Sequence, residues 1–253
     1  ESGVPTARFW PVSSDVDLWA ALRESQAEHF VLKPVDSRGA RGVLMIRRSD
    51  DLSARLAESM SFSPSKSCIV EEFEAGPQFS SESYFTPEWH ETPGFSDRNY
   101  ARIFDFYPHI IEDGGEAPTR VSLQDASEAA LLAVRAARAL GVERGTVKGD
   151  LVLTETGPKV IEIALRLSGG WFCTHQIPLL TGVDLVEAAM RTAVGEQVPR
   201  SAVRPKVSGG VAIRYFFPRE GTVAALPEAA EVNAMPGIVH HHFSARVGDR
   251  VGS

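Results

Sequence analysis

The segment 146–166 constrains the fold of this chain more than any other stretch, because its hydrophobicity alternates on both sides of a turn signal. The turn signal is Thr-Gly-Pro at 156–158, and a turn between two alternating arms is typical of a β-hairpin. Hairpin strands pair antiparallel, and residues two apart in a strand share one face. The segment therefore predicts an antiparallel sheet with charged side chains on one face and apolar side chains on the other.

Two carboxylates are expected to face each other in this hairpin. With the turn centred on Thr156, Asp150 lies six residues before it and Glu162 six residues after it. Like charges directly opposite across a ladder destabilise it by roughly 0.2–1 kcal/mol. One interpretation is a bound cation such as Mg²⁺, which takes oxygen ligands. The other is a solvent-facing hairpin in which Lys148 and Arg166 neutralise the acids.

Helical and strand-like segments alternate irregularly along the chain, which predicts an α+β fold built on antiparallel sheets and not a regular βαβ repeat. The expected helices, which begin near a Ser or Asp in cap position, are 13–25, 49–60, 122–141 and 184–195. The other expected strands are 30–35, 42–46, 67–73 and 78–85, with β-like sequence again from residue 207. Residues 86–121 are expected to form loops with one strand near 103–107.

The composition is that of an ordinary globular protein, with 43% hydrophobic and 23% charged residues. The net charge of −7 argues against a general nucleic-acid surface, although it permits a local basic pocket. Cys68 and Cys173 have no metal-ligand spacing, so we expect reduced thiols in a cytoplasmic protein. No run approaches the ~18 apolar residues needed to cross a bilayer. Because the chain opens with ESGVPTARF, without Met or a signal segment, we expect an N-terminal portion to be absent from it.

The stretch HFVLKPVDSRGARGVLMI, residues 29–46, contains chemistry suited to phosphate. Lys33 ends an apolar strand as a point charge. The loop that follows offers backbone N–H groups, together with Arg38 and Arg41, to an anion. Gly39 and Gly42 form neither a Walker A loop nor a GxGxxG motif, so a solvated basic loop remains the alternative.

Two further segments carry candidate ligand contacts. The strand CIVEEF ends in acids and breaks at Gly76-Pro77, a pattern that indicates a hinge whose polar edge can read adenine. In LSGGWFCTH, consecutive glycines let the backbone approach a ligand closely. His175 in that segment is either a titratable donor or a satisfied structural histidine. The run HHH at 240–242 is interpreted as a polar loop or strand and not as a metal site.

The order KPVDSRGARGV, then VEEFEAGPQFSSES, then GD–x11–EIALRLSGG resembles the ATP-grasp superfamily over about residues 3–195. The resemblance implies two α+β lobes whose antiparallel sheets sandwich a nucleotide. The expected parts are a small lid lobe at 1–74, a large lobe with metal and substrate sites at 75–200, and a truncated C-terminal β-rich extension at 201–253. The N-terminal domain of the superfamily is expected to be missing.

The resemblance also implies a role for each nucleotide-site residue. Lys33 is expected to contact the α- and β-phosphates, and Glu71 to take the adenine amino group. The lid over the phosphates is expected to comprise Ser37, Arg38, Gly39, Arg41 and Gly42. Glu72 and Phe73 are expected to supply backbone contacts to adenine. Gln78 stands where many members have a ribose-binding acid, so either Gln78 or Glu82 is expected to bind the ribose.

On the metal and substrate side, the resemblance implies that Asp150 and Glu162 hold Mg²⁺ or Mn²⁺. Arg166 is expected to steady the transferred phosphate or acyl phosphate. The substrate loop is expected to comprise Ser168, Gly169, Gly170 and His175. Ala164 stands where many members have Asn, which implies a second metal ion held less firmly or by other ligands.

The implied function is that of an ATP-dependent ligase, which activates a carboxylate as an acyl phosphate for attack by an amine. Its expected partners are small-molecule carboxylate and amine substrates, with no nucleic acid and no membrane, and a homodimer is a further expectation. One alternative is a bicarbonate-using enzyme similar to biotin carboxylase or carbamoyl-phosphate synthetase, which the β-like tail favours. Another is an ATP-binding module without catalysis, prompted by Ala164 and Gln78.

Overall fold

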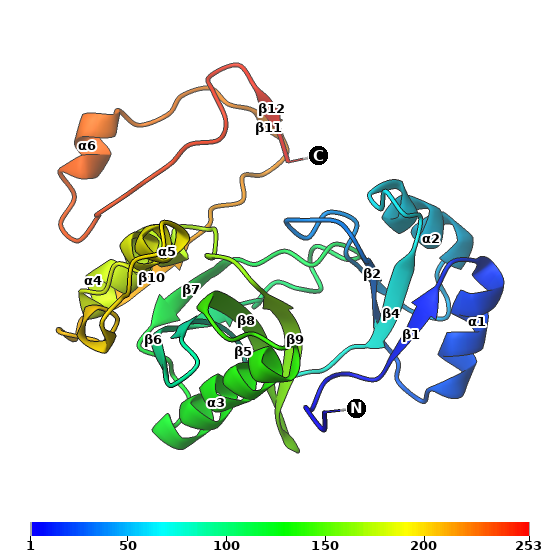
Figure 1. The fold of residues 1–253 in the computed structure, drawn as a ribbon. Coiled ribbons are helices and arrows are strands. Elements are labelled where there is room, and N and C mark those ends of the chain that lie inside the picture. Colours follow the sequence, from blue (N-terminus) through cyan, green and yellow to red (C-terminus); the bar gives the residue numbers. More distant parts are fainter. Residues whose placement is uncertain (1, 253) are drawn as a thin grey trace. The chain divides into compact units, whose positions relative to one another are not determined.

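A four-stranded antiparallel sheet covered by two helices forms the first lobe in the computed structural model, which describes residues 2–252 (Figure 1). The strands lie in the order β1-β4-β2-β3. Their bounds are β1 Phe9–Val12, β2 Phe30–Pro34, β3 Leu44–Ile46 and β4 Cys68–Glu72. The helices are α1 Asp15–Glu24 and α2 Leu52–Ser61.

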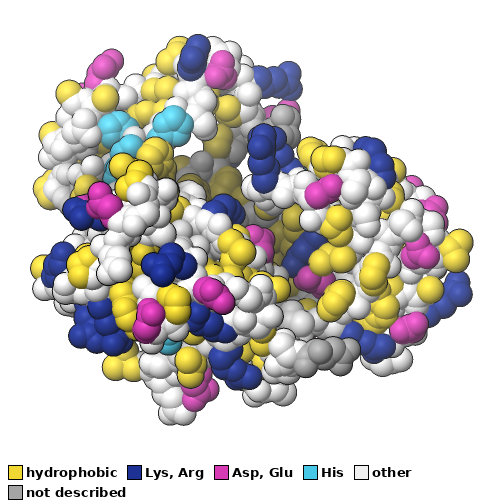
Figure 2. Space-filling view, in the orientation of Figure 1, with side chains coloured by type: hydrophobic (Ala, Val, Ile, Leu, Met, Phe, Trp, Pro, Cys, Tyr) yellow, Lys and Arg dark blue, Asp and Glu magenta, His cyan; other side chains and the backbone are white. Residues whose placement is uncertain are grey.

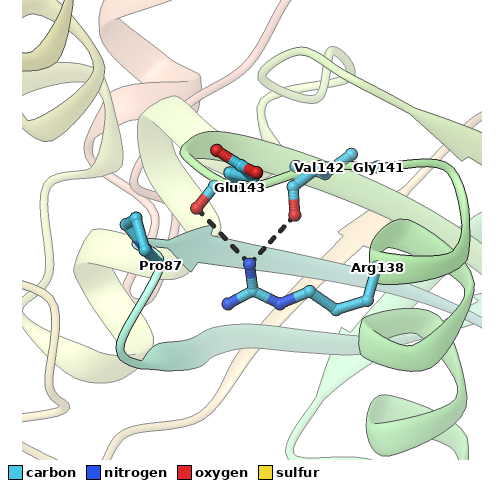
Figure 3. Close-up of a pocket in the computed structure, with 5 residues that line it drawn as sticks. All are labelled: Pro87, Arg138, Gly141, Val142 and Glu143. Carbon is cyan, nitrogen blue, oxygen red and sulfur yellow. Dashed lines mark hydrogen bonds between the residues drawn. The ribbon is translucent and has the colours of Figure 1, made fainter.

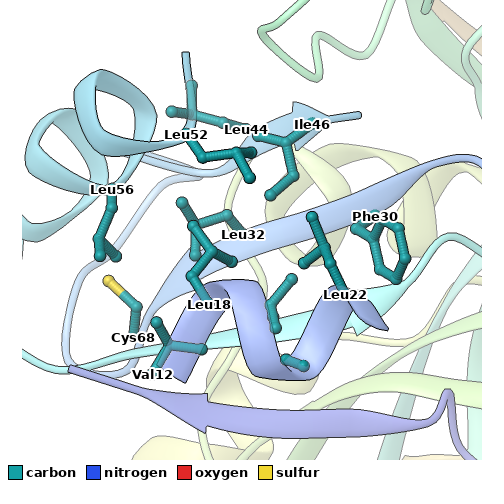
Figure 4. Packing of buried hydrophobic residues seen from close by; sticks show 12 residues of the cluster. Val12, Leu18, Leu22, Phe30, Leu32, Leu44, Ile46, Leu52, Leu56 and Cys68 are labelled. Atoms are coloured by element: carbon teal, nitrogen blue, oxygen red, sulfur yellow. The ribbon is translucent and has the colours of Figure 1, made fainter. Parts of the chain in front are cut away.

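Local capping and apolar burial explain why this lobe forms. The Ser14 hydroxyl accepts the N–H of Asp17 at the start of α1, and Asp51 accepts the N–H of Ala54 at the start of α2. The apolar sides of both helices pack on one face of the sheet (Figure 4). The core there includes Leu18, Leu22, Phe30, Leu32, Leu44, Ile46 and Leu56. Burying each such side chain stabilises the fold by roughly 1.5–3 kcal/mol.

A six-stranded antiparallel sheet forms the second lobe, in the order β10-β7-β6-β5-β8-β9. The strands are β5 Gln78–Phe85, β6 His90–Asn99, β7 Gly114–Ala117, β8 Gly145–Thr154, β9 Gly157–Ala164 and β10 Val211–Arg214. Helix α3, Leu123–Ala139, covers one face of this sheet. A Cβ on Gly149 of β8 would lie 2.9 Å from the Cβ of Ala133, so glycine permits this close packing. The opposite face is left to polar side chains and to a group of short helices.

The short helices follow β9 in the chain. They are the π-helix η1 Phe172–Gln176, α4 Ile177–Thr181, α5 Leu185–Ala193 and the 3₁₀-helix η2 Arg200–Ala202. Their apolar side chains pack with Tyr84 of β5 in one cluster. The Asp184 carboxylate caps α5 by accepting the N–H of Glu187 at 2.9 Å. This group closes part of the sheet face opposite α3.

The chain divides into two compact units between Arg214 and Tyr215. The second unit contains the short helix α6, Ala229–Asn233, and a pair of two-residue strands, β11 Gly221–Thr222 and β12 Arg250–Val251. Among the described residues, no helix of either unit combines the length and apolarity that a membrane crossing requires.

The predicted α+β class, the antiparallel sheets and the four capped helices are confirmed, but two strand predictions are wrong. Residues 86–121 contain β6 and β7, whereas 103–107 form turns. β6 carries Pro93 and Gly94, which disfavour strands, but pairing with β5 and β7 on both sides outweighs this propensity. The β-like tail is also shorter than expected. β10 belongs to the six-stranded sheet, and 237–247 contain no strand.

Candidate active site

One row of side chains crosses the polar face of the six-stranded sheet. β5 and β8 pair Ser80 with Asp150, and β8 and β9 pair Asp150 with Glu162. Residues directly opposite in a ladder point to the same face. The expected pairing of the two carboxylates is therefore confirmed, while their metal-binding role stays a prediction.

A β-bulge creates this pairing. Near the turn, Leu151 lies opposite Val160, and one residue further along Asp150 lies opposite Glu162, so Ile161 is an extra residue on β9. In a regular ladder continued from Leu151 and Val160, Ile161 would face Asp150. The bulge thus brings Glu162 to the polar face while Val160 packs into the core beneath α3.

Asp150 is buried and already has three donors. Its Oδ1 accepts the Ser80 hydroxyl at 2.8 Å, and its Oδ2 pairs with Arg98 Nη1 at 3.0 Å and with Lys148. Burial alone would raise the pKa of Asp150, but Arg98, Lys148 and the Ser80 hydrogen bond outweigh it and hold the pKa below its usual value. Lys148 thus neutralises Asp150, as the solvent-facing alternative expected, although Asp150 itself is not solvent-facing.

Glu162, by contrast, is exposed. In the part of the chain that the structure describes, no ion pair reaches its carboxylate, and Arg166 donates instead to the carbonyl of Leu167 at 3.0 Å. Mg²⁺ prefers one or two carboxylates together with phosphate oxygens and water, so the donor set of Asp150 and Glu162 fits the ion. No third Asp, Glu, His or Cys completes a closed metal site within residues 2–252. Phosphate oxygens and water are the ligands that Mg²⁺ usually adds to one or two carboxylates.

Arg98 is a site residue that the sequence did not reveal. Its Nε and Nη2 donate to Glu112 at 2.9 and 2.8 Å, and its Nη1 reaches Asp150. The guanidinium also lies 5.2 Å from the ring centroid of Tyr100. The only sequence signal for a strand here was that Phe95 stands between Gly94 and Ser96, with Arg98 two residues after Ser96. These residues lie in the stretch 86–121, which was expected from the sequence to form loops.

In the small lobe, the predicted phosphate lysine and the predicted adenine acid are in contact. Lys33 donates to the carboxylate of Glu71, and both side chains are largely buried. Val31 of β2 lies opposite Glu71 of β4, so Lys33, two residues further, shares their face. The structure therefore brings Lys33 and Glu71 together, and their contacts with a nucleotide stay predictions.

The expected lid segment 37–42 lies in the loop between β2 and β3, where residues 38–41 are exposed and Ser37 and Gly42 are half-buried. Gly39 and Ala40 have φ of +64° and +57°. Gly42 has φ of +76°, and a Cβ there would lie 2.9 Å from the ring of Phe62. Arg38 and Arg41 are both exposed on this loop. The geometry suits a lid whose shape depends on glycine.

The expected hinge is tied to both lobes. The N–H groups of Glu72 and Phe73 donate to the carbonyls of Arg8 and His29 at 2.9 and 3.0 Å, so these groups are engaged within the small lobe. The next residue, Glu74, forms an ion pair with Lys159 of β9 at 2.6 Å. Gln78 begins β5 between Arg98 and Val152. Basic and acidic side chains lie next to one another in the hollow between the lobes (Figure 2).

The expected substrate loop lies beside Glu82. Ser168 is buried and donates both its N–H and its hydroxyl to the Glu82 carboxylate. Gly169 and Gly170 are exposed. The His175 ring lies 5.1 Å from the Trp171 ring in an edge arrangement, and its Nδ1 is 2.8 Å from the Thr174 hydroxyl. Glu82 is thus placed with the substrate loop, and its predicted ribose contact stays a prediction.

A cavity of about 360 Å³ lies elsewhere, at the end of α3. Its lining is Pro87, Arg138, Gly141, Val142 and Glu143. Arg138 Nη1 donates to the carbonyls of Val142 and Glu143 at 3.0 and 3.5 Å (Figure 3). The arginine, in the last turn of α3, satisfies carbonyl groups of the segment that follows the helix. None of the predicted site residues lines this cavity.

Comparisons with known proteins agree with the motif order. A sequence model of the ATP-grasp domain matches residues 16–170. D-alanine–D-alanine ligase from Desulforudis audaxviator is 26% identical over 76% of this chain and 60% of its own length. Dapdiamide A synthase from Enterobacter agglomerans is 28% identical over 55% of this chain and 33% of its own length.

The fold also matches solved structures. An L-amino acid ligase from Bacillus licheniformis superposes with a TM-score of 0.76 and 19% identity, over 99% of this chain and 59% of that chain. At this identity the likeness shows the fold alone. The chain spans less than two thirds of the length of each of these three proteins.

Proposed function

The chain belongs to the ATP-grasp family, whose members generally use ATP and Mg²⁺, and from this membership we propose that it is an ATP-dependent ligase joining a carboxylate to an amine. One relative bears the name D-alanine–D-alanine ligase, which describes the joining of two amino acids. The proposal includes small-molecule substrates, action in the cytoplasm, and no nucleic-acid or membrane partner; a homodimer is part of the same proposal.

The observation that carries this proposal is the placement of Asp150 opposite Glu162. A bulge is needed to bring both carboxylates to one face, and two cations, Arg98 and Lys148, hold Asp150 charged. Phosphoryl transfer depends on positioning and charge neutralisation more than on covalent help from the protein. The paired carboxylates and the two cations on this sheet would supply both the positioning and the charge neutralisation.

The reaction proceeds in two steps. An oxygen of the substrate carboxylate forms a bond to the γ-phosphorus of ATP, and the bond to ADP breaks, which leaves an acyl phosphate. The amine nitrogen then bonds to the acyl carbon, inorganic phosphate leaves, and the nitrogen loses a proton. Bound Mg²⁺ would neutralise phosphate charge between Asp150 and Glu162.

The chain's own residues bind and orient the reactants. Lys33, after leaving Glu71, contacts the phosphates, and the lid at 37–42 closes over them. Glu71 then accepts the adenine amino group, and Gln78 hydrogen-bonds the ribose. The N–H groups of Glu72 and Phe73 already donate within the small lobe, so the backbone contacts of these two residues to adenine would use their carbonyl groups. Arg166 steadies the acyl phosphate. The loop of Ser168, Gly169 and Gly170, together with His175, faces the substrates.

The bicarbonate alternative was favoured by the β-like tail. In the described part of that tail, β10 joins the six-stranded sheet and the remainder contains two strands of two residues each, so the tail gives this alternative less support than expected. The alternative of an ATP-binding module without catalysis rests on Ala164 and Gln78, and the experiment below separates it from a ligase.

The test is phosphate release from Mg-ATP in the presence of amino acids, small carboxylates or bicarbonate, with mass spectrometry of the products. We expect amino-acid-stimulated release of phosphate together with an amide product. Asp150→Asn and Glu162→Gln should each abolish release, whereas Glu155→Gln in the hairpin turn should not. Stimulation by bicarbonate alone would favour the alternative reaction, and tight Mg-ATP binding without turnover would favour the non-catalytic module.

A further inference from the structure

Glu82 lies in the middle of β5, and its surroundings indicate a role other than the ribose contact. The residue is 0% exposed, although it carries a carboxylate. Both of its oxygens accept hydrogen bonds from the same residue. The backbone N–H of Ser168 lies 3.1 Å from Oε1, and the Ser168 hydroxyl donates to Oε2. A carboxylate bound through both oxygens by one residue fixes both the place and the orientation of that residue.

A ribose would have to reach an accessible oxygen of Glu82, and the packing around Glu82 prevents this. Ser168 occupies both oxygens. On the side of β6, Ile177 of α4 is fully buried against Gly94, the residue opposite Glu82. A Cβ on Gly94 would lie 2.4 Å from Cδ1 of Ile177 and 3.1 Å from the Cβ of Glu82. Glu82 is therefore enclosed between α4 and the loop that begins at Ser168.

Ser168 is the fixed end of that loop. Its carbonyl accepts the thiol of Cys173 at 2.8 Å, so its N–H, hydroxyl and carbonyl are all engaged. Gly169 has no atom within 4 Å of a Cβ built on it, and Gly170 has a φ of +60°. Ser168 precedes these two exposed glycines and anchors the loop. The position of Ser168 therefore sets where the glycines can present their backbone to a ligand.

Glu82 also adjoins the proposed metal carboxylate. Lys148 lies opposite Glu82 in the ladder and donates to Asp150. Burial raises the pKa of Glu82, and the Ser168 hydrogen bonds together with the charges of Lys148 and Arg166 oppose that rise. An ion pair thus joins Asp150 to Lys148, the ladder places Lys148 opposite Glu82, and hydrogen bonds join Glu82 to Ser168.

We infer that Glu82 is a positioning residue, which acts through Ser168 to hold the loop 168–171 in register with Asp150. The inference rests on the proposed function for its consequence, namely that Glu82 governs the carboxylate or amine substrate and not the nucleotide. Its structural part, the anchoring of the loop, can be measured without any turnover.

The first measurement is hydrogen exchange of peptides that cover 165–172, in the wild type and in variants. Glu82→Met removes both acceptors at similar size, and we expect exchange at the Ser168 amide to rise at least ~10-fold. Glu82→Gln keeps an acceptor for the N–H, and its NH₂ can donate to the Ser168 hydroxyl, so it should retain most of the protection. Ser83→Ala, on the other face of the same strand, is the control and should leave the loop unchanged. Unchanged protection in Glu82→Met overturns the inference.

The second measurement separates the substrates. We expect Glu82→Met to leave the Kd of Mg-ATP within about 2-fold, and to raise the KM of the carboxylate or amine or to lower kcat by ~10-fold or more. A 10-fold weaker Kd for Mg-ATP with a normal loop would assign Glu82 to the ribose and overturn the inference. If Glu82→Met does not fold, Ser168→Ala tests the same anchor from the loop side. If the wild type shows no turnover, only the proposed function is contradicted. Hydrogen exchange and the Kd of Mg-ATP still test whether Glu82 anchors the loop.

Discussion

At the scale of single residues, the site is organised by carboxylates that the protein buries. Asp150 is 5% exposed and stays charged because Arg98, Lys148 and Ser80 surround it. Removing one of these partners destabilises the fold, because a buried charge without a compensating partner raises the free energy of the folded state. Arg98 matters most here, because it also satisfies Glu112.

Arg98→Met should therefore destabilise the fold. We expect the free energy of unfolding to fall by about 3 kcal/mol, the lower end for removing one partner of a buried ion pair, because Lys148 remains beside Asp150. Urea denaturation with an unchanged m-value measures this. Arg102→Met, which removes an exposed arginine paired with Asp105, should cost less than about 1 kcal/mol. Equal effects of the two substitutions would contradict the structure of the site.

The surroundings of Glu91 predict that the stability of the fold depends on pH. Glu91 accepts hydrogen bonds from Arg200 at 2.6 Å and Arg204 at 2.7 Å. Burial alone would raise the pKa of Glu91, but the two arginines outweigh it and bring the pKa below its usual value. A carboxyl whose pKa is lower in the folded state stabilises the fold above its unfolded pKa, and this stability is lost as the pH falls through the folded value.

The unfolding free energies of the wild type and Glu91→Gln should therefore converge as the pH falls from about 5 to about 3. Urea titrations at several pH values give the two curves. A difference that stays constant over this range would show that Glu91 does not titrate as its arginine partners require.

Some of these residues could be predicted from the sequence and others could not. Asp150 and Glu162 were recognisable because they lie in a hairpin whose turn and alternation are local signals. Arg98 was not, because its significance depends on β6 lying between β5 and β7, which is a long-range pairing. The contact between Lys33 and Glu71, likewise, joins residues on two strands of the small-lobe sheet.

At the scale of elements, the bulge in β9 has the greatest consequence. One extra residue, Ile161, decides which side chain faces Asp150, because a shift of one residue exchanges the two faces of a strand. Bulges are common next to active sites, where they redirect a side chain.

The exchange of two neighbours, Ile161→Glu with Glu162→Ile, tests this point without changing composition. It moves the carboxylate to the bulged position. We expect the affinity for Mn²⁺ in the presence of ATP to fall at least ~10-fold, because changing a residue that only supports a metal ligand already costs about this much. Electron paramagnetic resonance of free Mn²⁺ measures the binding. Exchanging Glu155 and Thr156 in the turn is the matched control. Unchanged Mn²⁺ affinity in the first double variant would refute the metal-binding role of Glu162.

The elements that the sequence predicted well are those with local signals. Four helices follow Ser or Asp caps, and the strands of the first lobe are short apolar runs. β6 and β7 carry Pro, Gly and polar residues, and they become strands because neighbouring strands satisfy their backbone groups. The tail at 237–247 has the composition of a strand but lacks such a neighbour.

At the scale of the whole molecule, the chain carries a sequence match to the ATP-grasp domain over residues 16–170, and its fold matches that of an L-amino acid ligase over 99% of the chain. Lys33 and Glu71 lie on the sheet of the first lobe, and Asp150 and Glu162 lie on that of the second, while their contacts with a nucleotide stay predictions. The substrates were not predictable, because the surroundings of the loop after β9 depend on packing between segments far apart in the sequence. The chain spans 33% of the length of one relative and 60% of that of another, so the substrates belong to the proposal.

The most direct test of the central claim follows the carboxylate oxygen. The protein is mixed with Mg-ATP and a pool of the twenty common amino acids whose carboxylates are enriched in ¹⁸O, and the released phosphate is analysed by mass spectrometry. An acyl phosphate passes one carboxylate oxygen to phosphate, so we expect ¹⁸O-labelled phosphate together with an amide product. Phosphate released without ¹⁸O, or no phosphate beyond the level without amino acids, would contradict it.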